Sequence, residues 1–174
     1  VAIVDPDLAE TMPQKLVAHT GMDAMTHAVE AYVSTANCDY TDPLAIHAIE
    51  MIENDLVKSY NGDMDARARM HNAQCLAGMA FSNALLGIVH SMAHKTGAAF
   101  EDFGAHIIHG AANAMYLPKV IAFNAKDETA KKRYGVIVDY MGIADQSASD
   151  DDKVKALIDY LRKMNDDLNI PHCI

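Results

Sequence analysis

Four of the nine histidines of this chain lie in one apolar, glycine-punctuated stretch, residues 87–113. They are His90, His94, His106 and His109. His90 and His94 are four residues apart, so a helix would place both on one face, with Cβ atoms about 6 Å apart. An imidazole in apolar surroundings needs a polar partner, because an unpaired buried polar group is costly. A metal ion would satisfy several of these imidazoles at once.

A second set of possible ligands precedes this stretch, in residues 22–36. Asp23 and His27 have i and i+4 spacing, and Glu30 follows three residues later on the same helical stripe. An aspartate in a first helical turn is often there only to compensate the helix dipole. One carboxylate with two or three imidazoles nevertheless suits Zn²⁺ or Fe²⁺ better than Mg²⁺ or Ca²⁺. The spacing alone leaves a metal site and a structural role equally open.

Helices must position these side chains, and the hydrophobic periodicity predicts an all-α, multi-helix bundle of about seven or eight helices. Gly21 is expected to separate a short helix, capped by Thr11, from the next one, and Pro118 is expected to bend or break a later helix. The other helices are expected at 43–60, 64–85, 125–142 and 152–168. The only strand candidate is Val1–Val4.

Composition restricts the classes of protein that this chain can belong to. Its 174 residues suffice for one core. A net charge of −10 without a basic stripe argues against nucleic acid and anionic membranes as partners. No apolar run approaches the roughly 18 residues of a membrane helix. Three widely spaced cysteines, without a C-x-x-C pair, indicate neither a disulfide framework nor a thiolate metal site, so we expect a cytoplasmic protein.

Three motifs resemble the iron-containing (group III) alcohol dehydrogenase family. They are G-M-D-A-M-T-H-A-V-E-A-Y at residues 21–32, G-I-V-H-S-M-A-H at 87–94 and H-G-A-A-N at 109–113. The similarity extends from Val1 to about Pro171. The chain looks like the C-terminal helical domain of such an enzyme, similar to NAD(P)-dependent butanol dehydrogenases and to the dehydrogenase half of bifunctional aldehyde–alcohol dehydrogenases. The resemblance implies interconversion of a short-chain alcohol and its aldehyde or ketone by hydride transfer to NAD or NADP.

The resemblance also implies roles for individual residues. Metal ligands of the family correspond to Asp23, His27, His90 and His109, which would hold Fe²⁺ or Zn²⁺. His94 corresponds to a histidine that faces the nicotinamide and the substrate and could relay a proton. Phe81 corresponds to an aromatic residue of the substrate channel, although general experience favours the core for such a residue. The loop before the third motif is longer than in many members, so His106 competes with His109; the following Gly-x-x-Asn favours His109.

The expected domain organisation follows from the same resemblance. Residues 1–8 would be the last strand and linker of an α/β cofactor domain that this chain lacks, and 9–174 a helical metal-binding domain truncated at its C-terminal end. We expect the chain alone to be inactive and to self-associate, and the enzyme to be a homo-oligomer. Alternatives are a glycerol dehydrogenase or dehydroquinate synthase relative, and a helical metal-dependent phosphohydrolase. The metal, the dinucleotide and the alcohol stay open.

Overall fold

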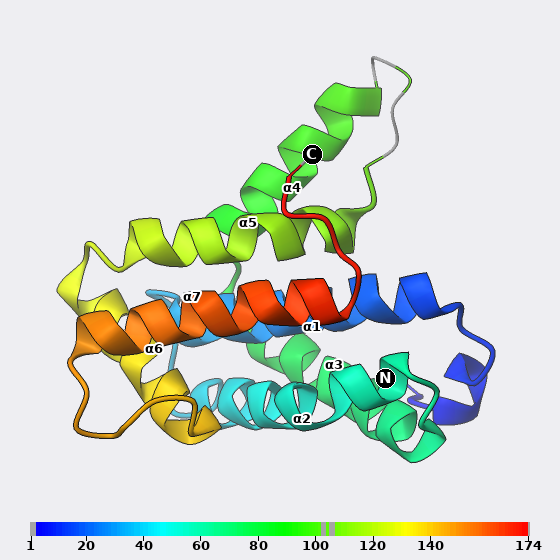
Figure 1. Cartoon of the computed structure of the whole chain (residues 1–174), viewed down its shortest axis with the longest axis horizontal. Coiled ribbons are helices and arrows are strands. Elements are labelled where there is room, and N and C mark those ends of the chain that lie inside the picture. Colours follow the sequence, from blue (N-terminus) through cyan, green and yellow to red (C-terminus); the bar gives the residue numbers. More distant parts are fainter. Residues whose placement is uncertain (1–2, 102–103, 105–106, 174) are drawn as a thin grey trace.

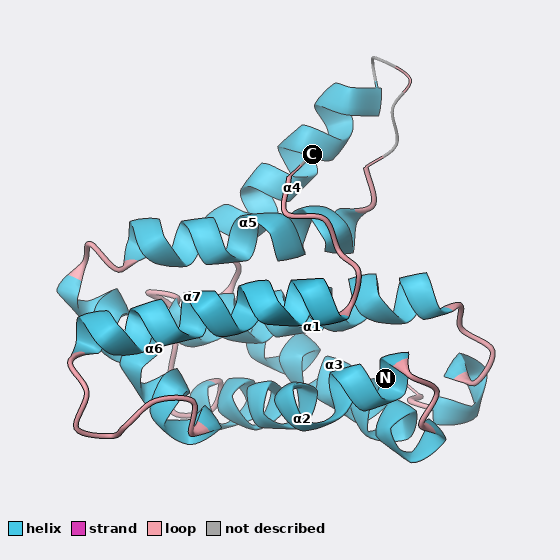
Figure 2. Ribbon diagram, in the orientation of Figure 1, coloured by secondary structure: helices cyan, strands magenta, loops and turns pink. Residues whose placement is uncertain are grey.

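The structure is a computed structural model that describes residues 3–101, 104 and 107–173. Within these ranges the chain forms helices and loops and no strand (Figure 2), which confirms the predicted all-α class. In the described residues, one short 3₁₀ helix, η1, precedes seven α-helices. The bounds are η1 Pro6–Ala9, α1 Gln14–Val33, α2 Asp42–Tyr60, α3 Met64–Ala84, α4 Ile88–Glu101, α5 His109–Asn124, α6 Glu128–Met141 and α7 Asp150–Asp167.

The central element is α1, which packs against α2 and α3 on one side and against α5 on another. Helices α6 and α7 pack together, and α7 also covers α5. Figure 1 shows α4 rising away from this bundle, attached mainly through α5. Among the described residues, every α-helix contributes side chains to the core, α4 through Val89. The large side chains Met22, Met25, Ile49, Ile52, Leu117, Ile121, Ile137, Leu157 and Leu161 are almost completely buried.

The helix break predicted at Gly21 is wrong, and Pro118, which was expected to bend or break its helix, does not break it. Gly21 lies inside the continuous helix α1, where a Cβ would be 2.1 Å from Leu56 Cδ1, so its role is to let α1 and α2 approach closely. Pro118 lies inside α5. Proline cannot donate to the carbonyl four residues earlier, and the Asn165 side chain of α7 donates to that carbonyl, Ala114 O, at 2.9 Å. Both helices therefore continue.

Local capping accounts for several helix boundaries. Asp63 accepts from the backbone N–H of Ala66 at the start of α3, and Asp127 accepts from two N–H groups at the start of α6. Ser149 caps α7 in the same way, and Gly142, with φ of +65°, ends α6 in the left-handed conformation. Thr11 is not the cap of α1, because Pro13 occupies that position without a side-chain hydrogen bond.

A sharp turn between α3 and α4 brings the first turn of α4 against Glu30 of α1, while the rest of α4 runs away from the bundle. Leu85 ends α3 with a positive φ of 67°, and the axes of α3 and α4 meet at 99°. In the described part of the chain no single helix is long and apolar enough to span a membrane; α3 and α4 pass that test only together, across the bend.

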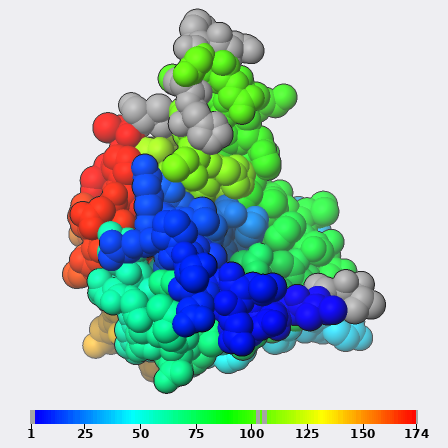
Figure 3. Space-filling model, turned by 90° about the vertical axis from the view of Figure 1, so that its right-hand side faces the viewer, coloured from blue at the N-terminus to red at the C-terminus, as the bar shows by residue number. Residues whose placement is uncertain are grey.

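The N-terminal segment lies against α3 (Figure 3). Val1 and Ala2 are outside the described residues, and Ile3 and Val4 do not form a strand, which would need a partner strand for its hydrogen bonds. The buried Arg67 of α3 fixes the following residues by donating to the carbonyl oxygens of Ala9, Glu10 and Met12. These hydrogen bonds therefore attach the N-terminal segment to α3 from Ala9 onwards.

Candidate metal centre

Three of the four predicted ligands converge at the point where α1, α4 and α5 meet. Asp23 lies in the middle of α1, His90 in the first turn of α4, and His109 is the first residue of α5. One ligand atom from each lies within 4.8 Å of the other two. Residues separated by up to 86 positions in the sequence, 109 minus 23, thus form one cluster.

The distances within this cluster fit a tetrahedral ion. Asp23 Oδ1 is 3.5 Å from His90 Nε2 and 3.5 Å from His109 Nε2. Donors bound to zinc at about 2.0–2.1 Å in tetrahedral geometry are about 3.4 Å apart. The spacing is too long for hydrogen bonds and suits donors that share a metal.

His90 has a buried nitrogen without a hydrogen-bond partner. The His90 residue is 3% exposed, and its Nε2 atom has no hydrogen-bond partner among the described residues. Burial by itself lowers the pKa of this imidazole, but the Asp23 and Glu30 carboxylates outweigh burial and raise the pKa to about 9. A buried nitrogen of this kind, next to a carboxylate and a second imidazole, is the donor that a divalent cation would satisfy.

Asp23 is held as an anion by its surroundings. Burial acts to raise its pKa, but His90, His27, Asn113 and His109 together lower it below the ordinary value. The buried amide Nδ2 of Asn113 donates to Asp23 Oδ1 at 2.6 Å and lies 3.0 Å from His109 Nε2. Asn113, four residues after His109 on α5, thereby links two of the candidate ligands.

His27 is adjacent to the cluster but not part of the group of three. Its ring stacks between those of His90 and Phe81, with centroid distances of 4.5 and 4.4 Å. Burial is the largest influence on the pKa of His27 and, although Asp23 opposes it, lowers the pKa to about 4. The neutral imidazole is the form that binds metal, but His27 does not belong to the group of donors within 4.8 Å of one another.

Two other candidates border the cluster. His94, one turn after His90 on α4, is exposed, and its ring centroid lies 4.6 Å from that of His109. Phe81, near the end of α3, contacts the cluster through His27. Burial is the largest influence on the pKa of His109 and lowers it below the ordinary value. The His109 imidazole is therefore also neutral at pH 7. His106 is outside the described residues.

Glu30 is a residue of this site to which the sequence alone gave no role. Its carboxylate contacts the first turn of α4. Oε1 accepts from the backbone N–H of Val89 at 2.7 Å, and Oε2 is 2.6 Å from His90 Nδ1. The signal in the sequence was its position seven residues after Asp23, on the same stripe of α1. Nothing in the sequence paired it with His90, 60 residues away.

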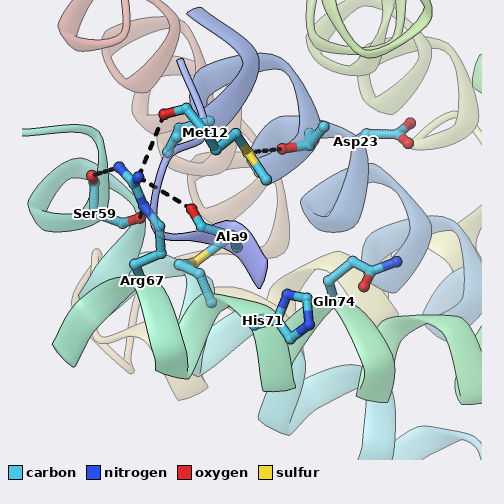
Figure 4. Close-up of a pocket in the computed structure, with 11 residues that line it drawn as sticks. Ala9, Met12, Asp23, Ser59, Arg67, His71 and Gln74 are labelled. Carbon is cyan, nitrogen blue, oxygen red and sulfur yellow. Dashed lines mark hydrogen bonds between the residues drawn. The ribbon is translucent and has the colours of Figure 1, made fainter. Parts of the chain in front are cut away.

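A cavity of about 270 Å³ adjoins the site between η1, α1 and α3. Figure 4 shows Arg67 at one end of it and the Asp23 carboxylate pointing away from Arg67. The Arg67 guanidinium donates to backbone oxygens of η1 and the residues that follow, and to Ser59 O and Oγ. With these bonds made, Arg67 serves as a structural anchor of the N-terminal segment.

Comparison with known proteins gives a consistent result. The family model described as "Fe-containing alcohol dehydrogenase family, C-terminal" matches residues 17–174. An NADPH-dependent butanol dehydrogenase of Clostridium saccharobutylicum is 58% identical over 171 residues, which are 98% of this chain and 42% of that protein. A bifunctional aldehyde-alcohol dehydrogenase of Escherichia coli (strain K12) is 38% identical over 190 residues, covering 100% of this chain and 21% of the relative.

Solved structures show the same fold. A 1,3-propanediol oxidoreductase superimposes with a TM-score of 0.88 at 38% identity, over 96% of this chain and 42% of that one. An iron-containing alcohol dehydrogenase from Thermococcus thioreducens superimposes with a TM-score of 0.87 at 37% identity, over 98% and 42% of the two chains. This chain thus spans less than half the length of these relatives.

Proposed function

The chain belongs to the iron-containing alcohol dehydrogenase family, and on that premise we propose that it is the metal-binding helical part of an enzyme that interconverts a short-chain alcohol and its aldehyde or ketone with NAD or NADP. The observation that carries this proposal is the Asp23, His90 and His109 cluster, with 3.5 Å donor spacing and a buried, unsatisfied His90 Nε2. A cation at this point would neutralise Asp23 and satisfy His90 together.

Four residues are proposed as ligands, Asp23, His27, His90 and His109, with Fe²⁺ as the metal and Zn²⁺ as the alternative. The set of one carboxylate and three imidazoles suits either ion. A metal held there would supply Lewis acidity to an alcohol oxygen, and a bound dinucleotide would supply the hydride acceptor. Asn113 orients Asp23 through the 2.6 Å hydrogen bond.

The remaining residues have proposed tasks around the substrate. His94 is exposed beside His109, so it can move the alcohol proton from the site towards solvent. Phe81 presents a partly buried ring against His27, which gives an alkyl chain an apolar wall close to the reacting carbon. We propose His94 as the catalytic residue that also faces the nicotinamide, and Phe81 as a residue of the substrate channel.

The whole enzyme is proposed to consist of two parts. Residues 1–8 would connect to an α/β domain that holds the dinucleotide, and residues 9–174 form the metal-binding part. The Clostridium saccharobutylicum relative is NADPH-dependent, which favours NADP. The alternatives of glycerol dehydrogenase, dehydroquinate synthase and phosphohydrolase receive no support from the relatives described above.

Partners and location are proposed on composition. The net charge of −10 argues against nucleic acid and an anionic membrane as partners. Cys38, Cys75 and Cys173 are free thiols, which favours the reducing cytoplasm. We propose a homo-oligomer that takes a small alcohol or aldehyde as its substrate.

A chimaeric enzyme tests the proposed activity. This chain would replace the matching segment of the Clostridium saccharobutylicum butanol dehydrogenase. The chimaera would be loaded anaerobically with Fe²⁺ and assayed for oxidation of butanol by the absorbance of NADPH. We expect turnover from the chimaera and none from the chain alone. A chimaera that folds, binds iron and NADP⁺ and oxidises no alcohol would contradict the proposal.

A further inference from the structure

We propose that Glu30 is the positioning residue of the metal centre: its carboxylate holds His90 with the hydrogen on Nδ1 and the lone pair of Nε2 facing Asp23 and His109. The inference rests on the proposed metal site, because it concerns how one of the ligands of that site is oriented. Three observations support it.

The first is the geometry of the pair. Glu30 Oε2 lies 2.6 Å from His90 Nδ1, and both side chains are 4% exposed. An ionised carboxylate can only accept a hydrogen bond, so the shared hydrogen belongs to Nδ1. In the neutral ring the lone pair is then on Nε2, the atom that lies 3.5 Å from Asp23 and has no hydrogen-bond partner among the residues that the structure describes. Outer carboxylates orient metal-binding histidines in this way.

The second is the attachment of the same carboxylate to the backbone. Glu30 Oε1 accepts from the N–H of Val89 at 2.7 Å, and Oε2 is 3.4 Å from the N–H of His90. These are N–H groups of the first turn of α4, which lack partners within the helix. One side chain of α1 therefore fixes both the start of α4 and the ring that this turn carries.

The third is the space that the carboxylate occupies. A Cβ at Gly87 would be 2.9 Å from Glu30 Oε1, so the glycine leaves room for the carboxylate against the turn that precedes α4. Water is excluded from the contact, since Glu30 and His90 are both buried. A hydrogen bond in such surroundings is stronger and more strictly oriented than one at the surface.

An amide cannot replace this carboxylate. Both oxygens of Glu30 accept from fixed donors, Val89 N–H and His90 Nδ1–H. Glutamine has one oxygen and one NH₂ group, so one of the two contacts becomes donor against donor. Either the start of α4 loosens, or the His90 hydrogen moves to Nε2 and blocks the metal.

The test compares Glu30→Gln with Glu50→Gln in the full chain, with Zn²⁺ alone as the probe. Glu50 forms the matched pair at the surface, with Oε2 3.3 Å from His47 Nδ1 and side chains that are 56% and 60% exposed. Calorimetry should give a zinc affinity roughly 10- to 100-fold weaker for Glu30→Gln, the range typical of outer partners of metal ligands, and no change for Glu50→Gln. Histidine ¹⁵N NMR of the zinc-saturated protein should lose the downfield Nδ1–H signal of His90 only in Glu30→Gln.

Two further variants separate positioning from general stability. Ile52→Val trims a fully buried side chain of α2, away from the cluster, and should leave zinc affinity unchanged. Gly87→Ala displaces the carboxylate while keeping every partner, and should also weaken zinc binding. If Glu30→Gln does not fold, zinc binding by Gly87→Ala tests the inference in its place, and an unchanged affinity in that variant would overturn it.

The possible results have distinct meanings. A folded Glu30→Gln protein that binds zinc as tightly as wild type would overturn the inference, as would an equal loss of affinity in Ile52→Val. A folded wild-type chain without any zinc binding would refute the proposed metal site itself, and the inference with it.

Discussion

Gly110, the second residue of α5, lies directly against the backbone carbonyl of His19 on α1. A Cβ at Gly110 would be 2.2 Å from His19 O and 2.7 Å from His19 C. Only a glycine permits this contact, and it brings the start of α5 onto α1 one turn before Asp23. The neighbouring His109 thereby comes within 3.5 Å of the Asp23 carboxylate.

Gly110→Ala should therefore damage both the fold and the metal site. The added methyl meets backbone atoms, which cannot rotate away, so we expect a loss of about 1–3 kcal/mol in the free energy of unfolding together with weaker metal binding. Gly78→Ala is the control: a Cβ there meets nothing within 4 Å, and helical Gly→Ala changes stabilise by up to about 1 kcal/mol. Urea denaturation and zinc calorimetry of both variants test the expectation, and an unchanged Gly110→Ala protein would contradict it.

His109 and His106 can be separated by metal analysis. His109→Ala should abolish metal retention, because His109 Nε2 is one of the three clustered donors. His106→Ala should retain the metal. Elemental analysis of the two purified variants, prepared in parallel with iron, checks this assignment, and the reverse pattern would make His106 the ligand.

His27 stacks between two rings and is also a proposed metal ligand, so its substitution should change metal affinity more than the free energy of unfolding. His27→Phe keeps a ring between Phe81 and His90, so the free energy of unfolding without metal should fall by no more than about 1 kcal/mol. Metal affinity should fall by more than roughly tenfold, a loss that even outer partners of a metal can cause. A variant that binds metal like wild type would show that the site uses three protein ligands, with His27 as a stacking residue only.

His94 should affect catalysis and not metal content. It is exposed and lies outside the group of three clustered donors. In the chimaeric enzyme His94→Ala should retain iron and lose turnover by roughly 10²- to 10⁴-fold, the range of general acid–base contributions, with the pH profile of kcat flattened. Loss of iron from this variant would identify His94 as a ligand instead.

The Asn165 side chain should matter only while residue 118 is a proline. Asn165 supplies the donor that Pro118 cannot give to Ala114 O. Asn165→Leu should cost about 1–3 kcal/mol in stability, the penalty for an unsatisfied buried carbonyl. In a Pro118→Ala background, where residue 118 has its own N–H, the same change should cost clearly less. Denaturation of all four proteins gives this double-mutant cycle, and equal costs in both backgrounds would refute the compensation.

The helical elements follow from local chemistry, which the sequence contains. Caps such as Asp63 and Ser149 and the stop at Gly142 act within a few residues of where they stand, so several boundaries were predictable. Neither Gly21 nor Pro118 breaks its helix, because the effect of each residue depends on contacts with another helix. Each is accommodated by a residue of another helix, Leu56 and Asn165 respectively.

For the site, the sequence determined which residues can bind a metal and which helices carry them, because i, i+4 spacing fixes their position on a helix face. Only the tertiary structure decided which donors meet. It joined Asp23, His90 and His109, placed His27 in a stack, and paired Glu30 with His90. The physical reason is that these contacts depend on the angle and distance between packed helices. Those are set by side-chain volume at contacts such as Gly110 against His19, many residues apart in the chain.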